Sequence, residues 1–169
     1  MTSDQIANRR NDPPYAKPIE PDWFLQQLVG LVNRVDIEFG ITLCVGGGLV
    51  SGTLVGGAKY FEGFGDDIED GFTEAFGGEE ERPIARDIAN QFRQHADLYS
   101  QHDAESDIAD RESDQTVTAR NAPPRFVHLS SARFFFGEGE HLPTNRGVWW
   151  RGRLDAVEGF SLGVLSVDA

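Results

Sequence analysis

Cysteine and long apolar runs are scarce in this sequence of 169 residues. Cys44 is the single cysteine, so an intrachain disulfide is excluded, and its place in an alternating apolar segment predicts a small buried side chain rather than a nucleophile. No run of 18 or more uncharged apolar residues occurs, which argues against a membrane-spanning helix. The first fifteen residues lack the apolar core of a secretory signal, so we expect a cytoplasmic protein.

Positive charge is also scarce. The chain carries 15 basic against 28 acidic residues, a net charge of −13, and Lys17 and Lys59 are its only lysines. Nucleic-acid binding depends on neutralising phosphates with Lys and Arg, and anionic membrane surfaces attract the same residues. We therefore expect neither nucleic acid nor a membrane as a partner, and the simplest role of the acidic surface is solubility.

Nucleotide-binding and catalytic motifs are missing. Gly47 and Gly52 have P-loop spacing, but Thr53 stands where the phosphate-binding Lys is required. The glycines at 46–48 precede a strand-like segment instead of the helix that a dinucleotide fingerprint needs. Ser51 lacks the glycine two residues earlier that a nucleophile elbow contains. The sequence therefore predicts no catalytic residue and no cofactor, and we expect a protein that is not an enzyme.

The four histidines do not form a metal motif. His95 and His102 are seven residues apart, whereas two ligands on one helical face are usually three or four apart. His128 and His141 belong to the other half of the chain and could join them only through the fold. The Asp and Glu runs do not reproduce a calcium loop either, so we expect no metal site.

The pattern of apolar residues predicts an α+β fold. We expect a disordered lead over residues 1–20 and a single domain over residues 21–169 with an acidic helical insertion at about residues 62–122. The domain is a curled antiparallel sheet, or a small open barrel, of about five strands packed by an N-terminal helix. The expected helices are 22–35 and 83–99; the expected strands are 41–45, 49–61, 125–136, 147–157 and 160–167, with turns at 46–48 and 158–159 and a solvated linker at 102–115.

Aromatic residues give the clearest candidate surface. The triplet 134–136 and the pair 149–150 place large side chains on both faces of their strands. The second face is therefore covered either by the chain's own helices or by another chain. Trp149, Arg151 and Arg153 share one strand face, and aromatic and Arg side chains are favoured at interface centres. We predict that these three residues contact a partner.

Three segments together resemble a known family. They are EFGITLCVGGGLVSGTLVGGAKYFE, FVHLSSARFFFGEG and GVWWRGRLDAVEGFSLG, and with the helix before them they are similar to the gas vesicle accessory protein U (GvpU) family. The resemblance covers roughly residues 22–62 and 125–167 and leaves the acidic middle unmatched.

The resemblance implies a cytoplasmic accessory factor associated with gas vesicles. Such a factor assists vesicle assembly, organisation or clustering through contacts with shell or other accessory proteins, and self-association remains open. Strongly bent strands after an N-terminal helix also resemble the Sm-like small barrel, a ring-forming adaptor unrelated to gas vesicles. The net charge of −13 argues against the RNA binding common in that group, but ring assembly by strand edges stays open.

Overall fold

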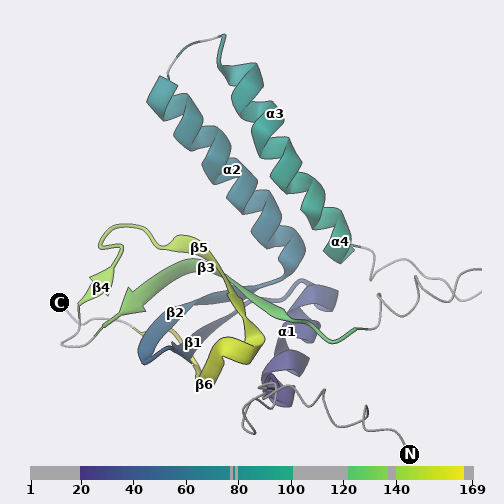
Figure 1. Cartoon of the computed structure of the whole chain (residues 1–169), viewed down its shortest axis with the longest axis vertical. Helices are drawn as coiled ribbons and strands as arrows, with labels where there is room; N and C mark the ends of the chain where they lie inside the picture. Colours follow the sequence, from purple (N-terminus) through teal and green to yellow (C-terminus); the bar gives the residue numbers. More distant parts are fainter. Residues whose placement is uncertain (1–19, 77, 79, 101–121, 137–139, 166–169) are drawn as a thin grey trace, which may run out of the picture.

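The protein combines one open sheet with helices on both of its sides (Figure 1). The structure, a computed structural model, describes residues 20–76, 78, 80–100, 122–136 and 140–165. The expected linker at residues 102–115 and, apart from Glu20, the expected lead at residues 1–20 lie outside this description.

The sheet is antiparallel and six-stranded, in the order β4-β3-β2-β1-β6 with β5 also paired to β3. Its members are β1 (Phe39–Val45), β2 (Gly48–Val55), β3 (Phe126–Phe135), β4 (His141–Leu142), β5 (Val148–Arg153) and β6 (Val157–Leu162). The pairing does not return from β6 to β4 or β5, so the sheet is open. The prediction of an α+β fold with an open, curled antiparallel sheet is confirmed.

Bulges account for the curvature of the sheet. The register shifts between Ser51 and Thr53 on β2 and between Leu129 and Ala132 on β3. Ser131, inside this second shift, has φ of 52°, in the left-handed region that few non-glycine residues occupy. An extra residue in one strand bends it and increases its twist, so β3 pairs with β5 near its start and with β4 near its end.

Helix α1 (Trp23–Val35) covers one face of the sheet. Asp22 caps it, because its side chain accepts a hydrogen bond of 2.8 Å from the backbone N–H of Leu25. Asp36 ends it in a left-handed conformation with φ of 47°. The helix buries Leu25, Val29 and Val32 against the sheet residues Ile41, Leu43, Leu54, Val127 and Leu129. The predicted helix at residues 22–35 is confirmed.

The turn between β1 and β2 is the predicted glycine turn. Gly46 and Gly47 have φ of 58° and 79°, and Val45 pairs with Gly48 across them. Two successive residues with positive φ match the twist of the flanking strands, which is why glycine suits both positions.

A helical hairpin follows β2, and here the expected structure was wrong. The second arm was expected to extend to residue 61, but β2 ends at Val55 and α2 (Gly57–Phe76) begins two residues later. Its partner α3 (Arg82–Arg93) continues through a 3-10 turn, η1 (Gln94–Ala96), into α4 (Asp97–Ser100), close to the predicted helix at residues 83–99. Figure 1 shows this hairpin rising from the sheet, on the side away from α1.

The C-terminal strands differ in their boundaries from the expected ones. Residues 147–157 were expected to form one strand with a turn at residues 158–159, but β5 ends at Arg153. The chain turns instead at a 3-10 helix, η2 (Leu154–Ala156), and residues 158–159 lie inside β6. Leu154 is fully buried in the core, and its backbone N–H donates to the carbonyl of Arg125, which fixes the turn earlier than the glycine at 159 suggested.

Candidate partner interface

Strand β5 has two unlike faces. Trp150 packs against the core cluster under α1, and Leu154 beyond the strand end belongs to that cluster. The predicted contact residues Trp149, Arg151 and Arg153 alternate with them and lie on the other face, on the side of the α2–α3 hairpin. Of the three, Arg151 and Arg153 are exposed and Trp149 is half-buried.

Trp149 is held by the chain's own helix. Its ring lies edge-on to Tyr60, with ring centroids 6.1 Å apart. A Cβ atom added at Gly63 of α2 would lie 1.9 Å from Cζ2 of Trp149, so the indole occupies the space that a larger residue at 63 would need. Part of the aromatic second face is therefore covered by a helix of the same molecule.

Arg151 is anchored by two rings. Its guanidinium carbon lies 3.5 Å from the centroid of the Phe126 ring, a cation–π contact. Its Nε donates to Nε2 of His128 across 3.3 Å, which requires that His128 be neutral at that nitrogen. Arg151 is thus an exposed residue whose side chain is fixed in direction, which lowers the entropy cost of using it in an interface.

His128 is fully buried at the base of the hairpin. The rings of Tyr60, Phe61 and Tyr99 surround it at centroid distances of 4.7, 6.1 and 5.5 Å. Burial, with the nearby Arg151 charge, lowers its pKa to about 3, so the imidazole is neutral at ordinary pH. Its Nδ1 has no hydrogen-bond partner within the described part of the chain.

Arg153 pairs with a neighbour in the following turn. Its Nε donates to Oδ1 of Asp155 at 2.9 Å, and its Nη2 contacts Oδ2 of the same carboxylate. This paired geometry lowers the pKa of Asp155 and keeps both groups charged. The pair is solvent-exposed, so it adds little to stability and leaves Arg153 available to a second carboxylate.

The segment of the chain that contains β5 is rich in arginine although the molecule is acidic. Residues 122–153 contain five arginines, at 125, 133, 146, 151 and 153, and only two acidic residues, at 138 and 140. The rest of the chain carries the excess negative charge. The exposed Arg151 and Arg153 therefore favour an acidic or polar partner at β5 over a basic one.

Among the described residues, His95, His141 and Cys44 do not assemble a site, and His102 lies outside the description. In the described ranges, no group of three or more His, Cys, Asp or Glu side chains could hold a metal ion. His141 Nδ1 lies 3.0 Å from the carbonyl oxygen of Pro143, and exposed His95 packs on Phe61. Cys44 is only half-buried, not buried as expected, and its thiol lies 3.5 Å from Oε2 of Glu158. Partial burial and that carboxylate raise the thiol pKa, which makes it a poor nucleophile.

Two hollows lie elsewhere on the surface. One, of about 500 Å³, is lined by Thr53, Ser131, Arg133 and His141 beside the C-terminal segment. The other, of about 690 Å³, lies along the outer face of α1 beside Trp23, Phe24 and residues 123–124. Neither brings together the residues that the sequence singled out.

Sequence reasoning missed the partners of the predicted residues. Tyr60, Gly63 and His128 decide how Trp149 and Arg151 are held, yet they lie 20 to 90 residues away in the chain. The one signal that could have pointed to α2 is the spacing of the phenylalanines at 61, 64, 72 and 76, which suits a helical stripe.

Comparison with known proteins identifies the family. The fold is an open α+β sheet whose candidate surface carries Arg and Trp side chains, and among the described residues no helix is long and apolar enough to cross a bilayer. The model of the family described as gas vesicle protein GvpU-like matches residues 22–165. The chain therefore belongs to the GvpU-like family of gas vesicle proteins. No curated protein and no solved structure matches it.

Proposed function

We propose that this protein is a non-catalytic, cytoplasmic accessory protein of gas vesicles. It assists vesicle assembly, organisation or clustering through protein–protein contacts. Its partners are the vesicle shell or other accessory proteins, with self-association as a further contact. Family membership over residues 22–165 is the observation that carries this proposal.

The β5 face is the proposed contact surface for the vesicle. Two exposed arginines there are held in fixed directions, Arg151 by the Phe126 and His128 rings and Arg153 by Asp155. The surrounding segment is basic within an acidic chain, which favours acidic or polar groups on the partner. Trp149 supports the surface from below by packing on α2.

The alternative of an Sm-like adaptor is less well supported. An N-terminal helix followed by strongly bent antiparallel strands fits both readings, so the fold alone does not separate them. Family membership favours the gas vesicle role. Ring assembly through the outer edges of β5 and β6 would be visible as a large, discrete mass in solution.

Charge-neutralising variants test the contact surface. The double variant Arg151→Ala/Arg153→Ala removes two positive charges from β5 and is expected to lower co-flotation with isolated gas vesicles at least tenfold. The double variant Arg82→Ala/Arg86→Ala removes the same charge from exposed positions on α3 and is expected to float like the wild type. Circular dichroism checks that both variants fold. Unchanged flotation of the β5 variant would overturn the assignment.

A further inference from the structure

The α2–α3 hairpin is amphipathic, and within the described part of the chain the outer part of its apolar side is exposed. Its large apolar residues recur every three or four positions and thus form one stripe on each helix. We call this set the hairpin face: Phe61, Phe64, Ile68, Phe72 and Phe76 on α2 and Ile84, Ile88 and Phe92 on α3. Phe72 and Phe76 are 38% and 64% exposed and Ile84 is 59% exposed, so the outer part of the face is open to water.

The two stripes lie on one side of the hairpin because small residues fill the space between the helices. Gly65, Ala85 and Ala89 are buried, and a Cβ added at Gly65 would lie 3.1 Å from the carbonyl oxygen of Ala89. The close approach leaves no room for the larger side chains between the axes. The Phe64 and Phe92 rings meet edge-on at 5.5 Å, which joins the stripes into one surface.

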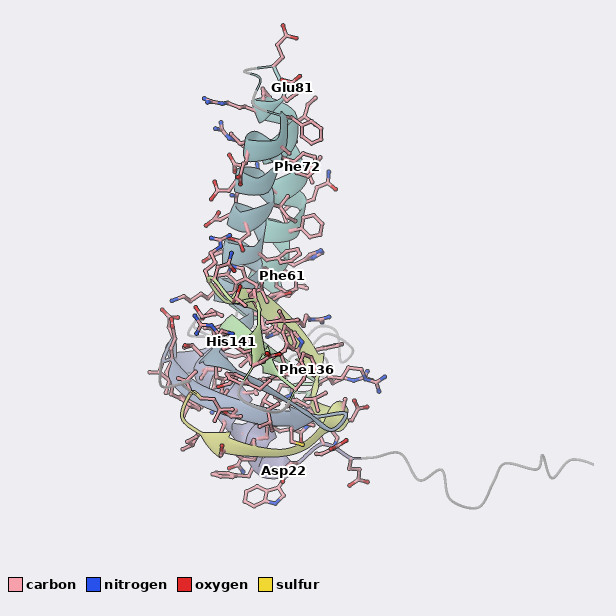
Figure 2. The ribbon with its side chains drawn as sticks, turned by 90° about the vertical axis from the view of Figure 1, so that its left-hand side faces the viewer. Asp22, Phe61, Phe72, Glu81, Phe136 and His141 are labelled. Carbon is pink, nitrogen blue, oxygen red and sulfur yellow. The ribbon has the colours of Figure 1, made fainter. Side chains whose placement is uncertain are left out.

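The charged side chains lie on the opposite side. Arg93 pairs with Asp66 at 2.6 Å and with Glu69 at 2.8 Å, and Arg86 reaches Glu69 at 3.4 Å. These helical positions fall away from the phenylalanine stripe, so these ion pairs do not lie within a contact between two hairpin faces. Figure 2 shows Phe61 and Phe72 along the hairpin, with Glu81 at its far end and no element of the sheet beside the outer turns.

We propose that the hairpin face binds the hairpin face of a second copy of this chain. This proposal specifies the self-association named under the proposed function. Two apolar two-helix layers packed about a two-fold axis make a four-helix bundle, in which each face covers the other. The same patch serves both partners, so no second complementary surface is needed.

The available area is sufficient for a stable dimer. Helix α2 has 20 residues and is therefore about 30 Å long at 1.5 Å per residue. Two helices packed at about 8–10 Å give a face roughly 20 Å wide, or about 600 Å² on each copy. Two such faces bury about 1,200 Å², which reaches the range of specific interfaces.

Light scattering after size exclusion, without vesicles, tests the proposal. The full chain is expected at twice its mass of 18.7 kDa, in low salt and in molar salt alike, because apolar contacts resist screening. The triple variant Phe72→Ser/Phe76→Ser/Ile84→Ser is expected at the mass of one chain. The control Phe136→Ser/Leu142→Ser, at positions 73% and 59% exposed away from the hairpin, is expected to stay at two.

The outcomes separate the proposals. A monomeric wild type, a dimeric triple variant, or a mass above two chains would overturn the hairpin dimer. If circular dichroism shows that the triple variant is unfolded, Ile84→Lys alone places a charge in the face at an exposed site, and it must then be monomeric. A dimer that does not float with vesicles would contradict the proposed vesicle role and leave the hairpin dimer standing.

Discussion

At the scale of single residues, the joint between hairpin and sheet depends on a neutral histidine. His128 accepts from Arg151, lies among three aromatic rings and is fully buried. Protonation would place a buried positive charge next to the charge of Arg151, and it would remove the acceptor nitrogen to which Arg151 donates. The position of the proposed contact arginine is therefore coupled to the charge state of His128.

Stability should accordingly fall as the pH is lowered below about 6.5. The pKa of His128 is about 3 in the folded protein, below its ordinary value of 6.5. As the pH falls below 6.5, the unfolded chain binds a proton at this residue and the folded protein does not, so acid stabilises the unfolded state. Between pH 6.5 and pH 5 we expect a loss of about 1.5 kcal/mol in the free energy of unfolding. Urea melts of wild type and His128→Gln measure it, with His95→Gln as the exposed control. Equal pH slopes in wild type and His128→Gln would contradict the account.

At the scale of elements, α2 shows why a helix can be missed when only the sequence is considered. Four glycines lie in this helix, at 57, 63, 65 and 71, and glycine weakens an isolated helix by about 1 kcal/mol each. Three of them are explained by close packing: Gly57 faces Tyr99, Gly63 faces Trp149 and Gly65 faces Arg93. From the sequence we expected a strand up to residue 61 and no helix between that strand and residue 83, because these contacts come from residues far along the chain.

Two of these glycines should respond oppositely to alanine. Gly63→Ala places a Cβ 1.9 Å from Trp149 and is expected to destabilise the protein by about 1–3 kcal/mol. Gly71→Ala meets nothing within 4 Å and is expected to stabilise it by about 0.5–1 kcal/mol, because alanine restricts the unfolded chain. Thermal unfolding of both variants, compared with the wild type, measures the two changes in stability. Effects of the same sign would show that α2 does not pack on β5 as described.

Other elements were predicted correctly from local patterns in the sequence. The spacing of apolar residues predicted α1, and the glycines at 46–48 predicted the first turn. The boundaries of β5 and β6 did not follow, since the burial of Leu154 moves the turn to residues 154–156. The short strand β4 was also missed, because its two residues carry no periodicity.

At the scale of the whole molecule, the charge is divided between regions. The chain is strongly acidic, but residues 122–153 are basic and the hairpin face is apolar. A vesicle contact at β5 and a self-contact at the hairpin face would make one dimer bivalent, and bivalent proteins raise the local concentration of whatever they join. The composition predicted an acidic protein; the separation of these surfaces depended on the fold.

The candidate site could be predicted only in part. The alternation of β5 put Trp149, Arg151 and Arg153 on one face, and the structure agrees on that face. Their unequal exposure could not be predicted, since it depends on α2 covering Trp149 and on His128 holding Arg151. Trp149 therefore packs beneath the proposed surface, and the exposed Arg151 and Arg153 are the residues that would contact the partner.

Flotation of the purified full chain with isolated gas vesicles tests the central claim most directly. An accessory protein that binds through arginines on β5 should rise with the vesicles at low salt and be released in molar salt, where such contacts are screened. Protein that stays wholly in the subnatant at both salt concentrations would contradict a direct role on the vesicle.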